Sequence, residues 1–160
     1  MHRKKIQLLK DLEKIVLRAR QKGERVVWTN GCFDILHVGH VRYLAAARRL
    51  GDHLVVGLNS NASTRKLKGP GRPLVRQDQR AEVLAGLESV SYITIFSAAS
   101  PFRLLERLQP DIFVKGGDYT VDTMDQRERA AIEHYGGKIR FIPFVTGSST
   151  TGIIEKIRRL

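Results

Sequence analysis

His37 and His40 lie three residues apart, so on a helix their imidazole rings would share one face. Both follow Gly31-Cys32, at a point where an apolar strand-like run gives way to a helical pattern. The amides and dipole at a helix start attract anions, and an imidazole can donate hydrogen bonds to phosphate oxygens. The spacing therefore predicts a phosphate site. The alternatives are a metal site that includes Asp34 and plain helix capping.

The segment after residue 60 has the highest density of positive charge in the chain, with Lys66, Lys68, Arg72 and Arg80 close together. A reaction between two phosphorylated substrates brings like charges together, and nearby cations offset that repulsion. The segment is therefore predicted to lie over the phosphate site. An exposed basic loop with no ligand is the alternative.

Two further segments have residue types that suit a nucleotide. The glycines of residues 116–117 let a ligand approach the backbone, and Asp118 can accept hydrogen bonds from sugar hydroxyls. Residues 148–151, Ser-Ser-Thr-Thr, open the last expected helix with hydroxyl and amide donors. A helix cap would need only one of those hydroxyls. The run is therefore predicted to bind phosphate as well as to cap.

Alternating strand and helix patterns must position these segments. Apolar runs predict strands over residues 25–29, 53–59, 92–96, 111–115 and 138–143. Helical spacing predicts helices over residues 8–23, 36–50, 78–87, 101–108, 124–135 and 150–159, with an exposed loop over 60–77. The pattern predicts an α/β fold: a single-domain, doubly wound, Rossmann-like parallel sheet with helices on both faces. The loops after the first, fourth and fifth strands are expected to converge on the ligand.

Length and charge set outer limits on function. A chain of 160 residues suits a single domain, with residues 1–24 as an N-terminal helix packed on residues 25–160. Lys and Arg number 28 against 16 Asp and Glu, a net charge of +12 that predicts an anionic partner. Cys32 is the single cysteine, which excludes an intrachain disulfide. No apolar run is long enough for a signal peptide or membrane helix, so a cytoplasmic location without a membrane partner is expected.

Five motifs together carry a family resemblance: GCFDILHVGHVRYL, LKGPGRPL, QRAEVL, VKGGDYT and GSSTTGIIEKI. They resemble the nucleotidyltransferase superfamily, whose HxGH motif is shared with class I aminoacyl-tRNA synthetases. Within it they are most similar to the D-glycero-β-D-manno-heptose 1-phosphate adenylyltransferases. That resemblance implies transfer of AMP from ATP to the sugar phosphate, giving ADP-heptose and pyrophosphate for lipopolysaccharide or surface-glycan precursors. Members of this group also occur fused to a sugar kinase, for which the present length leaves no room.

The resemblance also implies roles for individual residues. The catalytic roles fall to His37, His40 and Lys68. Acceptor binding falls to Asp34, Lys66 and Lys115, although Asp34 can equally orient its loop. Nucleotide binding falls to Gly31, Cys32, Phe33, Gly39, Arg80, Gly116, Gly117, Asp118, Gly147, Ser148, Ser149, Thr150 and Thr151. Mg²⁺ is expected as a cofactor held through the substrate phosphates, without a metal ligand from the protein.

ATP and a sugar 1-phosphate are thus the expected partners, bound by a homo-oligomer of two or four chains and without nucleic acid. Other readings stay open at this point. The same chemistry can serve another acceptor, such as glycerol 3-phosphate with CTP. An RNA-binding module fits the basic charge, but the basic segment has few aromatic residues for base stacking. A nucleotide binder without catalysis fits less well, since both histidines are present.

Overall fold

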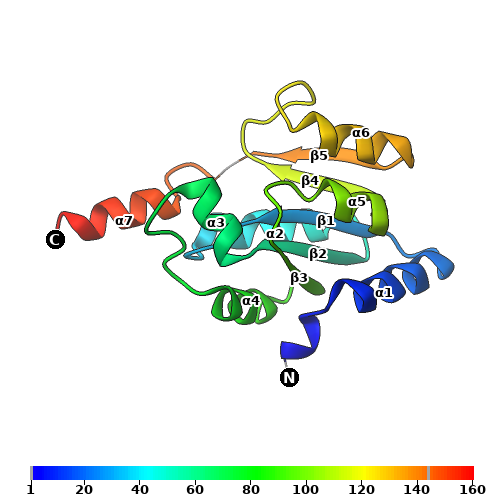
Figure 1. Ribbon diagram of the computed structural model, residues 1–160, viewed down its shortest axis with the longest axis horizontal. Coiled ribbons are helices and arrows are strands. Elements are labelled where there is room, and N and C mark those ends of the chain that lie inside the picture. Colours follow the sequence, from blue (N-terminus) through cyan, green and yellow to red (C-terminus); the bar gives the residue numbers. More distant parts are fainter. Residues whose placement is uncertain (1, 144) are drawn as a thin grey trace.

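The computed structural model describes residues 2–143 and 145–160, and this part of the chain forms one five-stranded parallel sheet (Figure 1). The strands are β1 (Val26–Gly31), β2 (His53–Asn59), β3 (Tyr92–Phe96), β4 (Ile112–Gly116) and β5 (Lys138–Ile142). The helices are η1 (His2–Lys5), α1 (Leu9–Gln21), α2 (Val38–Arg48), α3 (Asn61–Lys68), α4 (Gln77–Ala85), α5 (Phe102–Leu108), α6 (Gln126–His134) and α7 (Thr150–Arg158).

The order of the strands, β3-β2-β1-β4-β5, confirms the doubly wound class. From β1 the chain proceeds outward through β2 to β3 and then crosses back to β4 on the other side of β1. Such a reversal leaves a crevice at the carboxyl ends of the two central strands, which is where α/β sheets bind ligands. The topology therefore places the candidate site at the ends of β1 and β4.

Alternation along β1 divides the core between the two faces of the sheet. Val27 points to one face, whereas Val26 and Trp28 point to the other. Trp28 is fully buried, and Gly57 on the paired strand leaves the space that its indole occupies. A Cβ atom at Gly57 would lie 2.3 Å from the Trp28 ring, so only glycine fits there. The central strands are therefore covered by packed side chains on both sides.

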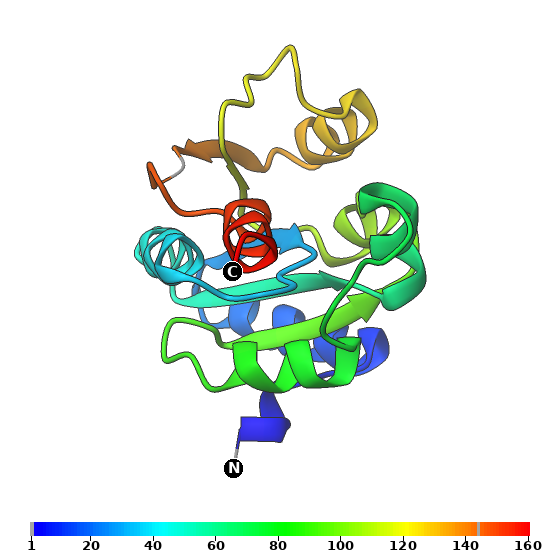
Figure 2. The same cartoon turned by 90° about the vertical axis from the view of Figure 1, so that its left-hand side faces the viewer.

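Helices cover both faces. The face of Val27 packs against Leu44 of α2 and Leu84 of α4, and the opposite face packs against α1, α5 and α6 through Leu12, Leu105 and other apolar residues. Figure 2 shows α2 on one side of the sheet and α5 and α6 on the other. Within residues 2–143 and 145–160, no helix combines the length and apolarity needed to cross a bilayer.

The expected loop over residues 60–77 is wrong for its first half, which forms α3. Ser60 caps this helix, since its hydroxyl accepts a hydrogen bond from the Ser63 amide at 3.2 Å. The helix buries Ser63 and Thr64, which are polar residues and gave no apolar pattern. Its basic residues occupy the last turn, where the negative end of the helix dipole stabilises cations. Composition suggested a loop, but cap and dipole favour a helix.

Candidate functional site

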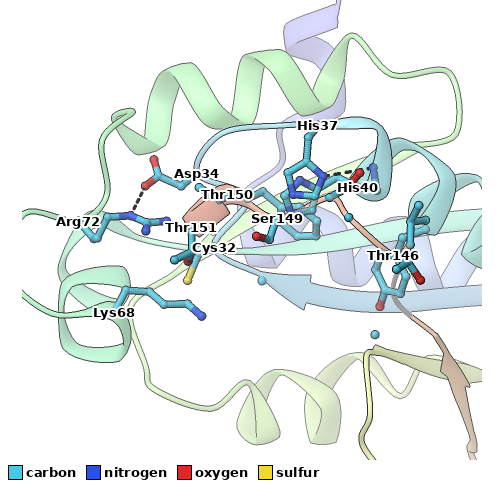
Figure 3. Close-up of a pocket in the computed structure, with 18 of the residues that line it drawn as sticks. Cys32, Asp34, His37, His40, Lys68, Arg72, Thr146, Ser149, Thr150 and Thr151 are labelled. Atoms are coloured by element: carbon cyan, nitrogen blue, oxygen red, sulfur yellow. Dashed lines mark hydrogen bonds and ion pairs between the residues drawn. The ribbon is translucent and has the colours of Figure 1, made fainter. Parts of the chain in front are cut away.

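A cavity of about 700 Å³ opens at the carboxyl ends of β1 and β4 (Figure 3). The loop after β1 and the segment after β5 line it as predicted, whereas β4 contributes only its last residue, Gly116, and not the loop that follows. Lys68 and Arg72 line it from the basic segment. Its volume lies within the range of ordinary small-molecule sites.

His37 caps helix α2 with its own side chain. Its Nδ1 accepts a hydrogen bond from the Gly39 amide at 3.2 Å. An accepting Nδ1 carries no proton, so the neutral ring bears its proton on Nε2. Burial lowers the pKa of His37 below its ordinary value. The helix-capping alternative is therefore correct for Nδ1 of His37, while Nε2 is a hydrogen-bond donor that the cap does not use.

His40 packs against the tilted ring of His37, with ring centroids 4.0 Å apart, and against Phe33 at 5.4 Å. Burial, with a smaller contribution from His37, lowers its pKa to about 4. Its Nδ1 is buried and has no hydrogen-bond partner among the described residues. At neutral pH both rings are therefore uncharged in the free protein, and a phosphate placed against them would raise their pKa. A charged imidazole at this site would thus depend on a bound anion.

The low pKa of His40 predicts acid sensitivity. The ring prefers to be neutral in the folded state, with a pKa of about 4, whereas an unfolded histidine titrates near its ordinary value of 6.5. The unfolded chain therefore binds more protons between these values, and stability falls as pH drops from 6.5 towards 4. After allowance for partial exposure, the loss is about 1 kcal/mol. Urea unfolding at pH 7 and 4.5 should show a smaller loss for His40→Gln.

His134 provides the control for that measurement, because it is exposed on α6. His134→Gln should lose as much stability between the two pH values as the unmodified chain. If His40→Gln and His134→Gln gave the same pH dependence, the burial of His40 would not be the source of acid sensitivity.

Glycines allow the elements around the rings to approach closely. A Cβ at Gly39 would lie 2.9 Å from the His37 ring and 3.3 Å from the Ser148 side chain. A Cβ at Gly116 would lie 2.9 Å from the Tyr43 ring. The two distances of 2.9 Å are shorter than an alanine tolerates. The two glycines therefore allow the segment before α7 and the end of β4 to lie close to α2.

The start of α7 faces the cavity with hydroxyl groups. Ser149 caps the helix, since its Oγ accepts a hydrogen bond from the Gly152 amide at 2.9 Å. Thr150 donates its hydroxyl to the carbonyl of Ile35 at 3.1 Å, which ties α7 to the loop after β1. Ser148 and Thr151 also line the cavity. The amides of this first helical turn have no intrahelical acceptor, so the cap leaves donors for an anion.

Most of the predicted site residues lie together. The cavity is lined by Gly31, Cys32, Phe33, Asp34, His37, Gly39, His40, Lys68, Gly116, Gly147, Ser148, Ser149, Thr150 and Thr151. Five others do not line it: Lys66, Arg80, Lys115, Gly117 and Asp118. Lys66 and Asp118 are exposed, and Gly117 is buried with its amide bonded to the carbonyl of Ile142.

Two of the absent cations are engaged within the chain. Arg80 is 1% exposed, and its guanidinium donates to the carbonyls of Cys32, Asn59 and Val75. Lys115 donates to the Glu128 carboxylate at 2.6 Å, in a pair that is almost fully buried. Neither side chain lines the cavity, so the geometry does not favour the nucleotide contact predicted for Arg80 or the acceptor contact predicted for Lys115. Both are better described as groups that hold the surrounding segments in place.

Asp34 lines the cavity, but its carboxylate is occupied by the chain. It accepts hydrogen bonds from Arg72 and from the amides of Leu74 and Val75. Burial alone would raise its pKa, but these hydrogen bonds together lower it. The orienting role left open for Asp34 therefore fits the geometry better than contact with the acceptor.

Sequence reasoning missed several cavity residues. Asn30, Tyr43, Val145 and Thr146 line the cavity without having been predicted. Tyr43 follows His40 by three residues on the same helix, so helical spacing gave a usable signal. Its hydroxyl bonds Thr29 Oγ1 at 2.6 Å and the Val114 carbonyl at 3.2 Å, which joins α2 to β1 and β4. The others had no distinctive pattern.

The described residues contain no group of three or more His, Cys, Asp and Glu side chains placed to hold a metal ion. The alternative of a metal site built from Asp34, His37 and His40 therefore lacks geometric support.

Comparisons with known proteins agree with this geometry. A family model described as "Cytidylyltransferase-like" matches residues 28–156. The chain is 52% identical over 153 residues to "Bifunctional protein HldE" of Syntrophotalea carbinolica, covering 96% of this chain and 31% of that protein. It is 53% identical over 154 residues to the protein of the same name from Geotalea uraniireducens, with 96% and 31% covered. The chain thus spans about a third of the length of these relatives.

One solved structure gives an independent comparison of the fold. It is the crystal structure of the lipopolysaccharide core biosynthesis protein from Thermoplasma volcanium GSS1. Its TM-score to this chain is 0.64 at 25% identity, and the match covers 79% of this chain and 100% of the other.

Proposed function

Because the chain belongs to the cytidylyltransferase-like family, we propose that it transfers AMP from ATP to D-glycero-β-D-manno-heptose 1-phosphate. A phosphate oxygen of the sugar phosphate attacks the α-phosphorus of ATP, the bond from the α-phosphorus to the bridging oxygen breaks, and pyrophosphate leaves with that electron pair. The products are ADP-heptose and pyrophosphate. No covalent intermediate with the protein is required.

The observation that carries the proposal is the pair of adjacent histidines at the N-terminus of α2, in one cavity with Lys68 and the hydroxyls that open α7. The Nε2 proton of His37 is available to a phosphate oxygen, because Nδ1 is engaged with Gly39. Fixed donors aimed at developing charge lower a barrier without reorganisation. The transfer needs only positioning and charge stabilisation, which this arrangement supplies.

The remaining donors suit the leaving pyrophosphate. Lys68 ends α3 at the cavity, and residues 149–151 begin α7 there. Mg²⁺ is part of this proposal, bound through the phosphates of ATP, where it would offset their charge. No protein ligand is assigned to it.

The acceptor is inferred from the resemblance of the motifs, and the relatives support it. Their name describes two functions, and this chain aligns with about a third of their length, which is consistent with one of the two. The similar protein from Thermoplasma volcanium is described as a lipopolysaccharide core biosynthesis protein. A cytoplasmic location and an assembly of two or four chains stay predictions.

A substrate panel tests the proposal. The chain is incubated with each of ATP, CTP, GTP and UTP against heptose 1-phosphate, glycerol 3-phosphate and pantetheine 4′-phosphate, and pyrophosphate release is followed. Release is expected with ATP and heptose 1-phosphate, with the product identified as ADP-heptose by mass spectrometry. Turnover restricted to CTP and glycerol 3-phosphate would contradict the assigned base and acceptor. Salt-dependent RNA binding without any pyrophosphate release would contradict the enzymatic function altogether.

A further inference from the structure

Asp34 and Arg72 form a buried ion pair at the edge of the cavity. Arg72 Nε lies 2.6 Å from Asp34 Oδ2, and the two side chains are 18% and 1% exposed. Asp34 also accepts from the Val75 amide at 2.8 Å and from the Leu74 amide at 2.9 Å. One carboxylate in the loop after β1 thus binds three donors from the basic segment.

Arg80 joins the same two segments through other atoms. Its guanidinium donates to Cys32 in the loop after β1 and to Val75 in the basic segment, the latter at 2.8 Å. It also donates to Asn59 at the end of β2 at 2.9 Å. The stretch that carries Arg72 is therefore fixed to the loop after β1 by two buried groups of opposite charge.

The pair leaves the terminal nitrogens of Arg72 available. Only Nε is engaged with Asp34, and within residues 2–143 and 145–160 neither Nη atom has a hydrogen-bond partner. Arg72 lines the cavity together with Lys68. In Figure 3 the guanidinium extends from Asp34 towards Cys32 and Thr151, on the side from which Lys68 also enters. The two Nη groups form a planar fork that matches the spacing of two phosphate oxygens.

We propose that Arg72 binds the triphosphate of the nucleotide and that Asp34 is the positioning residue that aims its guanidinium. The assignment rests on the proposed function for the identity of the ligand. The triphosphate is favoured over the acceptor phosphate because Arg72 shares its side of the cavity with Lys68 and the hydroxyl-bearing start of α7. Asp34 then acts through Arg72 and has no contact with the acceptor.

The test is an equilibrium titration with ATP, and separately with inorganic tripolyphosphate, in the absence of any acceptor. Arg72→Gln should weaken binding of both by about 10- to 100-fold, the range for a lost charge-assisted contact. Arg76→Gln is the matched control, because Arg76 is exposed, pairs with Asp78 and does not line the cavity. It should bind within about twofold of the unmodified chain. Equal affinities of the Arg72 and Arg76 variants would overturn the proposal.

A double-mutant cycle tests the role of Asp34. Asp34→Asn keeps an acceptor for the backbone amides but removes the charge that holds Arg72, so it should weaken ATP binding about threefold or more. In an Arg72→Gln background the same change should have less than a twofold effect. Effects that multiply would show that Asp34 acts on binding independently of Arg72. Arg72→Lys tests the same point, since an ammonium keeps the charge but lacks the planar fork that pairs with Asp34 and with phosphate at once, and it should retain only part of the affinity.

Kinetic constants separate the two phosphate sources. Arg72→Gln should raise KM for ATP while changing KM for heptose 1-phosphate less than about twofold. A rise confined to the sugar phosphate, with unchanged ATP binding, would overturn the assignment to the triphosphate. Failure of the unmodified chain to use heptose 1-phosphate would refute the proposed function alone, because the ATP titrations require no acceptor.

Discussion

Replacing His40 with alanine is expected to lower kcat by about 10²–10³, the loss seen when one preorganised donor to a developing oxyanion is removed. His40 is expected to act in the transition state, so KM for ATP should change much less than kcat. The fold should survive, because His40 Nδ1 has no hydrogen-bond partner among the described residues and the change breaks no such bond there. Steady-state pyrophosphate release and the far-UV circular dichroism spectrum measure the two effects.

The control for this variant is His134→Ala, which removes an exposed imidazole from α6 and should keep full activity. Near-normal kcat in His40→Ala would remove His40 from the reaction. A similar loss in both variants would point to a general effect on the protein and not to the histidine pair.

Replacing Glu128 with alanine is expected to lower the free energy of unfolding by about 3–5 kcal/mol, the usual cost of leaving one member of a buried ion pair without its partner. Glu128 lies on α6 at 3% exposure, and it accepts from Lys115 at 2.6 Å and from the Ser100 hydroxyl at 3.2 Å. Urea unfolding at pH 7 measures the change.

The double variant Lys115→Met, Glu128→Leu separates structure from substrate binding. Without charge on either side, stability should recover to within about 1–2 kcal/mol of the unmodified chain, as apolar replacement of buried pairs often allows. Its KM for the sugar phosphate should stay within about twofold. A large rise in the KM for the sugar phosphate, in a double variant that is folded and stable, would instead support the predicted role of Lys115 in acceptor binding.

The sequence was most informative where local pattern and topology agree. Apolar runs located the strands, and the parallel order then brought the loop after β1, the end of β4 and the segment after β5 to one cavity. It was least informative about partners that are distant in the chain. Nothing in the spacing of Lys115 and Glu128, or of Asp34 and Arg72, indicates that they pair, because such contacts arise only from packing.

The same limit explains Arg80. The family resemblance assigned Arg80 to nucleotide binding, yet its donors satisfy carbonyls from three different segments. Burial of a guanidinium is unfavourable unless its donors are satisfied, and which carbonyls are free to satisfy it depends on the assembled fold. The sequence pattern missed helix α3 for a related reason. This helix is held by the Ser60 cap and by the contacts of Ser63, and it has no apolar face that the pattern could show.

Helix α7 differs from the other α-helices of residues 2–143 and 145–160 in having no buried residue, and in Figure 1 it extends away from the sheet. Its hydrogen bond from Thr150 to Ile35 lies in its first turn, beside the cavity. Opening of this helix would expose little apolar surface, so its local free energy of opening lies well below that of global unfolding. A ligand held at its first turn would then stabilise α7 by mass action. The order of α7 and the occupancy of the cavity are thus two measures of one equilibrium.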